Sequence, residues 1–301
     1  MAVFQIRVDE RHTQRGNEYL IDNPKANLVI ITGMAEHSRR YEPLAKRLNY
    51  EGYSVSVLDH WGQGENCPDV KDLQKWEKGS WYVSLRALNL VVEKMRKHTG
   101  KPVYLMGHSM GSFMVQNYLF YFPGTVDKAI IMGSNGPNGK CVLSMGNMLA
   151  KMLTTKKNWD KPAKPLDRVS LSAYAKSIKN RKTDCDWLSY NEENVKRYMN
   201  DPYCGHMNTY GFFHEFLGAM VTLYKKKNLA RVSKKQPLLI IAGDSDPVGA
   251  CGKGPKALEK MYKNLGVKEV ELKVYQHMRH EILNEVDSNI VMDDIVTFLN
   301  K

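Results

Sequence analysis

Short apolar runs recur along this 301-residue chain, and each ends in glycine, aspartate or another turn residue. Five of them are rich in valine, isoleucine and leucine, and they occupy residues 27–32, 53–59, 102–107, 128–133 and 237–243. Such near-continuous runs are typical of strands buried on both faces of a sheet. A sixth run, 270–275, alternates more, and segments with helical spacing lie at 41–50, 81–98, 110–122 and 290–299. This alternation predicts an α/β fold with a mostly parallel sheet.

The alternation of strands and helices stops after Gly136 and resumes only at Pro237. Two apolar stripes with helical spacing fill part of the gap, at 145–153 and 212–220. We therefore expect two core parts, residues 1–136 and 229–301, with a helical cap of residues 137–228 inserted between late strands. Such a cap would cover the carboxyl edge of the sheet, where open α/β sheets bind ligands.

The most specific chemical motif is Gly107-His108-Ser109-Met110-Gly111. It follows one predicted strand and opens one predicted helix, and this context distinguishes a nucleophile elbow from an ordinary Gly/Ser turn. A serine at such a turn projects its hydroxyl above the sheet, and the two glycines permit close backbone approach. The only near match elsewhere, around Ser144, lacks the first glycine and a preceding strand. We therefore predict Ser109 as the nucleophile.

A serine hydroxyl needs a base, and in this order of elements the acid and then the histidine should follow it. The turn after 237–243 offers Asp244 and Asp246, and we prefer Asp246 because the Asp-Pro pair marks the chain leaving the strand. The loop after 270–275 offers His277 and His280. We prefer His280, because a histidine that must reach over the sheet edge fits the later position.

The developing oxyanion needs two N–H donors. Met110, the residue after the nucleophile, can supply one from its backbone. The second should come from the loop after an early strand, so we assign it to the backbone N–H of Met34. The N-terminal end of the helix that begins behind Ser109 would favour the same negative charge.

Together these motifs resemble the monoacylglycerol lipase and lysophospholipase branch of the α/β-hydrolases, also described as serine aminopeptidase-like. The resemblance rests on residues 33–41, 59–64, 107–111, 243–247 and 279–285 and spans both core parts. It implies hydrolysis of esters that carry one acyl chain, an acyl-enzyme intermediate, and neither cofactor nor metal. The chain departs from the family pattern at Thr32-Gly33, where His-Gly is usual, and at Gln63, where the motif Gly-His-Gly is usual.

The formal net charge is +12, and much of the excess lies in residues 151–182, which contain ten lysines and arginines against two acids. This basic stretch adjoins the apolar stripe 145–153, so the cap could contact an anionic membrane. Packing of the stripe onto the core is the commoner arrangement for an amphipathic helix. A solvated lysine-rich face is the plain alternative for the charges.

The chain has no apolar run of the ~20 residues that a membrane span needs, and residues 1–11 alternate as a strand rather than forming a signal peptide. Five scattered cysteines without CxxC spacing predict neither a disulfide framework nor a zinc site. We therefore expect a cytoplasmic protein that could also contact the membrane peripherally through its basic cap.

Three other functions remain to be weighed. A serine peptidase would use the same triad, although the basic cap argues mildly against it. A catalytically silent lipid- or partner-binding protein would be expected to lack a triad member, and all three are present. A nucleic-acid-binding protein would need a reading module beside the charge, and none is recognisable, so we expect no nucleic acid as partner.

Overall fold

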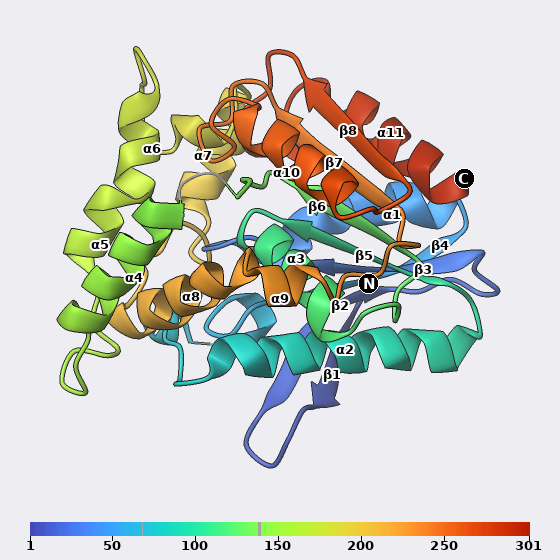
Figure 1. Ribbon diagram of the computed structural model, residues 1–301, viewed down its shortest axis with the longest axis horizontal. Helices are drawn as coiled ribbons and strands as arrows, with labels where there is room; N and C mark the ends of the chain where they lie inside the picture. The colour runs from blue at the N-terminus through green and yellow to red at the C-terminus, as the bar shows by residue number, and fades with distance from the viewer. Residues whose placement is uncertain (68, 138–139) are drawn as a thin grey trace.

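The computed structural model describes residues 1–67, 69–137 and 140–301, and it contains an eight-stranded sheet (Figure 1). The strand order is β1-β2-β4-β3-β5-β6-β7-β8. Strands β3 to β8 run parallel to their neighbours, whereas β2 is antiparallel to both β1 and β4. The predicted α/β class with a mostly parallel sheet is thus confirmed. The strands are β1 Ala2–Arg7, β2 Thr13–Tyr19, β3 Ala26–Ile31, β4 Tyr53–Leu58, β5 Val103–His108, β6 Lys128–Met132, β7 Leu238–Gly243 and β8 Val270–Tyr275.

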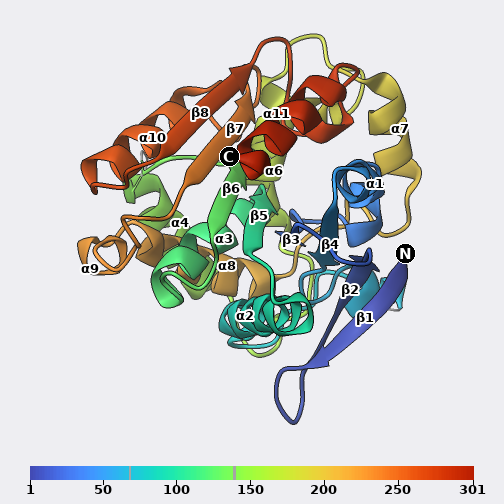
Figure 2. The ribbon, with the colours of Figure 1, turned by 90° about the vertical axis from the view of Figure 1, so that its right-hand side faces the viewer.

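Helices cover both faces of the sheet, which is why its central strands are apolar at nearly every position (Figures 1 and 2). Val29 and Ile31 of β3 face a core built with α2 Ser80–Thr99, α3 Met110–Tyr121 and α10 Lys253–Asn264. Leu28 and Ile30 face the opposite core, which α1 Glu42–Tyr50 and α11 Ser288–Asn300 complete. Successive residues of one strand therefore serve two cores. Single 3-10 turns lie at Ser38–Tyr41, Gly64–Asn66, Val70–Asp72, Asp186–Leu188 and Ile282–Asn284.

The chain between β6 and β7 is helical; α4, α5 and α6 lie at the left of the molecule, and α8 leads from there back to α9 beside α3 (Figure 1). They are α4 Lys140–Leu153, α5 Lys164–Val169, α6 Leu171–Ser177, α7 Glu192–Asn200, α8 Tyr210–Leu223 and α9 Lys226–Leu229. Aromatic packing and hydrogen bonds fasten this segment to the core: Phe212 meets Trp76 edge-on at 4.9 Å between ring centroids, and the Thr209 hydroxyl donates to the Gln74 carbonyl at 2.8 Å. The limits 137–228 for a separate cap stay a prediction.

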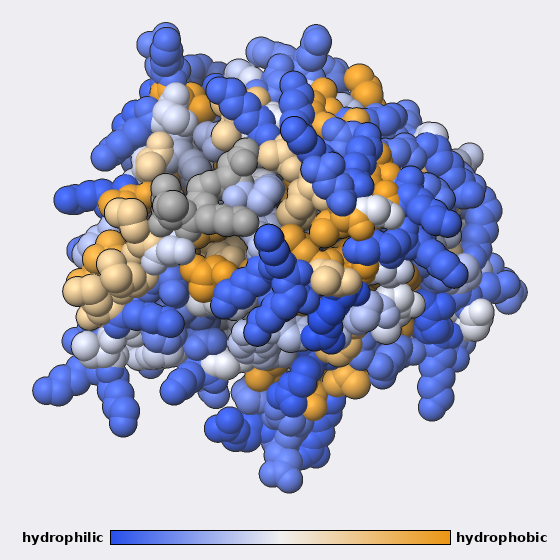
Figure 3. All heavy atoms as spheres, in the orientation of Figure 1, coloured by the Kyte–Doolittle hydropathy of each residue, from blue (hydrophilic) through white to orange (hydrophobic). Residues whose placement is uncertain are grey.

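Most of the apolar stripe of α4 faces outward. Met145, Met148, Leu149 and Met152 are between 39% and 72% exposed, and apolar side chains lie among hydrophilic ones over this side of the molecule (Figure 3). The expectation that the stripe packs onto the core is therefore wrong for these four residues. It holds for Leu153, which packs against the core cluster. Across the described ranges, no helix combines the length and the apolar character needed to cross a membrane.

His60 joins the ends of two neighbouring strands. It follows β4, its side chain is fully buried, and its Nε2 donates to the Thr32 carbonyl after β3 at 2.8 Å. Its Nδ1 has no partner among the described residues. Protonation would therefore place an unpaired charged N–H in the interior. Burial lowers the pKa of His60 to about 4, although the bond to Thr32 acts in the opposite direction.

The low pKa of His60 predicts an acid-sensitive contribution to stability. The unfolded chain takes up this proton near pH 6.5, whereas the folded chain resists it until about pH 4, so stability is full above pH 6.5 and falls as the pH drops between these values. In urea unfolding, His60→Gln, whose amide can still donate to Thr32, should lose about 2 kcal/mol less than the wild type between pH 7 and pH 5. His98→Gln, at an exposed position, serves as the control. Equal losses in wild type and His60→Gln would contradict this assignment.

Candidate active site

Ser109 occupies a strained turn between β5 and α3. Its backbone angles are φ 51° and ψ −118°, a conformation that residues other than glycine rarely adopt. The turn closes so tightly that a Cβ at Gly107 would lie 2.2 Å from the Gly111 carbonyl oxygen, and one at Gly111 would lie 2.3 Å from that of Ile31. Any side chain at Gly107 or Gly111 would therefore collide with a backbone carbonyl. The Ser109 N–H donates to the Met132 carbonyl at 2.9 Å, which ties the turn to β6.

The turns after β7 and β8 bring an aspartate and a histidine together. His280 Nδ1 and Asp246 Oδ2 are 3.0 Å apart, and both side chains are buried. The second oxygen of Asp246 accepts the Val248 N–H at 2.8 Å. Of the alternatives, Asp244 accepts the Ser245 hydroxyl. His277 stacks on Tyr190 with ring centroids 4.1 Å apart. The hydrogen bond thus joins the two residues preferred on sequence grounds.

The elbow and the histidine loop meet through His108. Its ring centroid is 4.7 Å from that of His280, and its Nε2 lies 3.2 Å from the His280 carbonyl oxygen. The Ser109 hydroxyl has no hydrogen-bond partner within the described ranges. A long or absent serine–histidine bond is common in the resting state of such sites, because the bond tightens when substrate binds.

His108 carries a charge that sequence reasoning missed. Its Nδ1 faces Glu36 Oε1 at 3.1 Å, and its Nε2 faces a carbonyl, so both ring nitrogens must donate. Burial alone would lower the pKa of His108, but the Glu36 carboxylate outweighs it and raises that pKa. The side chain is therefore best described as a buried imidazolium paired with a carboxylate.

Glu36 is the centre of this buried group. Its Oε1 accepts the Gly33 N–H at 2.5 Å and the Tyr41 hydroxyl at 2.8 Å, in addition to His108. Burial would raise the pKa of Glu36, but His108 and the guanidinium of Arg40, 3.0 Å away, hold it well below its usual range. The carboxylate is thus ionised and saturated with donors.

Arg40 extends the group to the histidine loop. It contacts both oxygens of Glu281 at 2.6 and 2.7 Å, and Asn194 of α7 donates to the same carboxylate at 2.6 Å. Because Glu281 follows His280 directly, the loop after β3, the histidine loop and α7 are held by one set of charges. The sequence placed these acidic and basic residues in family-like motifs, but nothing in their spacing indicated the contacts.

The side chain of Gln63 holds the loop 33–36 through three hydrogen bonds. Its side chain is fully buried, and its Oε1 accepts the Ala35 N–H at 3.0 Å. Its Nε2 donates to the carbonyls of Gly33 and Glu36 at 2.9 and 3.0 Å. Ala35 has φ 55°, a conformation that needs such support. Gln63 stands where a histidine is usual in the family. Its side chain accepts one hydrogen bond from this loop and donates two to it.

The backbone N–H groups of Met34 and Met110 remain free of protein acceptors in the parts of the chain that the structure describes. Met110 is the first residue of α3, so its N–H lies at the positive end of the helix dipole. Met34 stands on the loop that Glu36 and Gln63 fix. Unpaired N–H donors held by a fixed backbone are what a developing oxyanion requires, so Met34 and Met110 stay the predicted donors.

Known proteins resemble this chain over nearly its whole length. Monoacylglycerol lipase of Mycolicibacterium smegmatis is 26% identical over 292 residues, which cover 92% of this chain and 89% of that protein. Monoglyceride lipase of Homo sapiens is 26% identical over 273 residues, covering 89% and 80%. The crystal structure of a thermostable carboxyl esterase from Bacillus coagulans with glycerol has the same fold, with a TM-score of 0.88 at 24% identity, and covers 100% of this chain and 98% of that chain.

The family comparison confirms the resemblance that the motifs indicated. The match to the family described as serine aminopeptidase, S33, runs over residues 22–287, from the turn before β3 to the last helix. It includes every motif described above. With this match and its mostly parallel sheet, the chain belongs to the serine aminopeptidase S33 family of α/β-hydrolases.

Proposed function

We propose that the protein is a serine hydrolase that cleaves carboxylic esters of single acyl chains. The observation that carries this proposal is the buried His280–Asp246 pair beside a strained serine elbow. A polar pair of this kind, with the histidine at the edge of the sheet, is suited to removing a proton from a hydroxyl. The names of the relatives, monoacylglycerol lipase and monoglyceride lipase, support the ester class.

In the proposed mechanism, Ser109 Oγ attacks the ester carbonyl while His280 Nε2 takes the hydroxyl proton. Asp246 holds the Nδ1–H and stabilises the imidazolium. The oxyanion accepts hydrogen bonds from the backbone N–H groups of Met34 and Met110. His280 then gives its proton to the departing alcohol, which leaves an acyl group on Ser109. Water, activated by His280, releases the carboxylic acid and restores the serine.

An ester is favoured over a peptide amine as the substrate group. An aminopeptidase needs a free carboxylate to receive the substrate ammonium. Glu36 and Glu281 lie close to the site, but His108 and Arg40 already occupy them. The ring of Trp187 in the cap segment is tilted against that of His280 with centroids 5.1 Å apart, and the Tyr174 ring lies 5.5 Å from that of Trp187, so aromatic surface borders the histidine.

The exposed apolar face of α4 supports peripheral contact with an anionic membrane. Its four exposed apolar side chains continue into a basic segment in which Lys151, Lys156, Lys157, Lys161 and Lys164 are exposed. An apolar face rimmed by lysines binds at the boundary between head groups and acyl chains. Such docking would bring the cap to a supply of lipid substrate.

Ser109→Ala should reduce turnover of p-nitrophenyl esters, from acetate to palmitate, and of a monoacylglycerol by about 10⁴-fold or more. The exposed Ser144, in the near-match sequence, supplies the control Ser144→Ala, which should leave turnover unchanged. Parallel assays with aminoacyl amides test the peptidase alternative. Retained ester turnover in Ser109→Ala would refute the nucleophile, and preferred cleavage of the amides would refute the ester class.

Gln63→Leu should lower kcat by about 10- to 100-fold with little change in KM, because it removes the three hydrogen bonds that fix the oxyanion loop. Gln63→His, which restores one donor and one acceptor, should recover part of the loss. Steady-state kinetics on one ester measure both constants. An unchanged kcat in Gln63→Leu would show that the loop does not depend on this side chain.

Replacement of Met145, Met148 and Met152 together by serine should weaken binding to phosphatidylglycerol vesicles about tenfold or more, since their apolar surface no longer enters the interface. Co-sedimentation measures the bound fraction. Met199→Ser, at a 52% exposed position on α7, is the matched control. Equal binding by the triple variant and the wild type would remove α4 from the proposed contact.

A further inference from the structure

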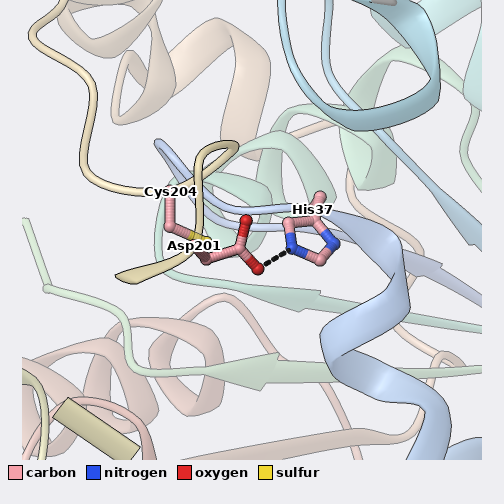
Figure 4. A group of neighbouring side chains, drawn as sticks. All are labelled: His37, Asp201 and Cys204. Carbon is pink, nitrogen blue, oxygen red and sulfur yellow. Dashed lines mark hydrogen bonds and ion pairs between the residues drawn. The ribbon is translucent and has the colours of Figure 1, made fainter. Parts of the chain in front are cut away.

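Three side chains of metal-ligating types meet at the junction of the core and the cap segment. One ligand atom each of His37, Asp201 and Cys204 lies within 4.8 Å of the others (Figure 4). His37 Nε2 and Asp201 Oδ2 are 2.8 Å apart. His37 and Cys204 are buried, whereas the Asp201 side chain is 30% exposed. The group is therefore enclosed by protein and reached by solvent from the side of the carboxylate.

The three residues come from two segments that hydrogen bonds hold in register. His37 follows the oxyanion loop directly, and Asp201 and Cys204 lie in the turn after α7. Within that turn, the Cys204 N–H donates to the Asp201 carbonyl at 3.1 Å. The Ala35 carbonyl of the oxyanion loop accepts the Gly205 N–H and the Tyr198 hydroxyl, both at 3.0 Å. The ligand backbones are thus already positioned relative to one another.

We propose that His37, Asp201 and Cys204 form a binding site for a zinc-type divalent cation, with water as the fourth ligand. An imidazole nitrogen, a thiolate sulfur and a carboxylate oxygen are all zinc ligands, and the sulfur disfavours Mg²⁺ and Ca²⁺. In a tetrahedral zinc site the ligand atoms lie about 3.3–3.8 Å apart. The three ligand atoms already lie within 4.8 Å of one another, so side-chain movements that open the His37–Asp201 hydrogen bond would bring them to this spacing.

The charges of the site balance. Binding releases the Cys204 thiol proton to solvent, so Zn²⁺ meets one thiolate and one carboxylate, and the net charge of the buried group becomes zero. Arg40 is the nearby cation that acts on Cys204. Its guanidinium is engaged by Glu36 and Glu281, which offset its repulsion of the ion. A neutral assembly of this kind avoids the penalty of an uncompensated buried charge.

A bound ion would join the cap segment to the oxyanion loop through metal–ligand bonds. This inference does not rest on the proposed ester chemistry, because it concerns ligand geometry alone. The cysteine spacing gave no sign of the site, since the histidine and the cysteine are far apart in the sequence and meet only when α7 docks on the loop.

The test is zinc binding by the untagged, reduced full chain, measured by competition with a chromophoric chelator, and repeated with Co²⁺, whose thiolate complexes show a charge-transfer absorption band. We expect one ion per chain, a cobalt band, and a rise in Tm with the ion. Cys204→Ser should abolish the band and weaken zinc binding about 100-fold or more, and Asp201→Asn, at the accessible rim, should weaken it as well.

Cys251→Ser, at an exposed thiol, and His206→Gln, in the neighbouring turn, are the controls and should retain binding. Circular dichroism of each variant without metal separates loss of ligand from loss of fold. Failure of the wild type to bind one zinc ion would overturn the proposal. So would zinc affinity and a cobalt band that persist in a folded Cys204→Ser variant, or that disappear in Cys251→Ser.

Discussion

The carboxylate of Glu36 is the group on which the geometry of the site depends. It lies in the interior, where an isolated charge would be strongly unfavourable, and it is accommodated because Gly33, Tyr41, His108 and Arg40 all direct hydrogen-bond donors at it. The donors belong to three segments of the proposed active site: the loop 33–36, the turn that follows it, and the strand β5 that ends in the elbow. Since a buried charge with a missing partner is costly, these segments hold one another in place.

The same logic connects the two halves of the proposed chemistry. Through Arg40, the cluster reaches Glu281, next to His280, and through His108 it reaches the His280 carbonyl. His280, the proposed base, and the loop 33–36, the proposed oxyanion loop, are therefore positioned by one hydrogen-bonded unit, while Asp246 holds the ring of His280. The glycines on both sides of Ser109 complete the arrangement, since their missing side chains let α3 approach β3 and β5 closely.

Much of this architecture could be predicted from the sequence, because central strands that are buried on both faces consist of nearly continuous runs of apolar residues. Strand β2 was missed since its sequence, TQRGNEY, is polar. It pairs antiparallel near the edge, where residues such as Gly16 serve backbone contact rather than the core. The stripe of α4 was assigned to the core because periodicity reports amphipathicity but not what covers the apolar face.

The candidate triad followed from chain order and local turns, both of which are local in sequence. The Glu36–His108–Arg40–Glu281 group did not follow, and neither did the meeting of His37 with Cys204. These contacts join segments up to 241 residues apart, and their partners are chosen by the fold. Spacing along the chain therefore carries no information about them.

The central claim, that Ser109 is a nucleophile activated by His280, is tested most directly by covalent trapping. The protein is treated with a p-nitrophenyl alkylphosphonate, and the modified residue is identified by peptide mass spectrometry. The account predicts one phosphonyl group per chain on Ser109, with labelling about 10³-fold slower or more in His280→Gln. Labelling of another residue, or equally fast labelling of Ser109 without His280, would contradict it.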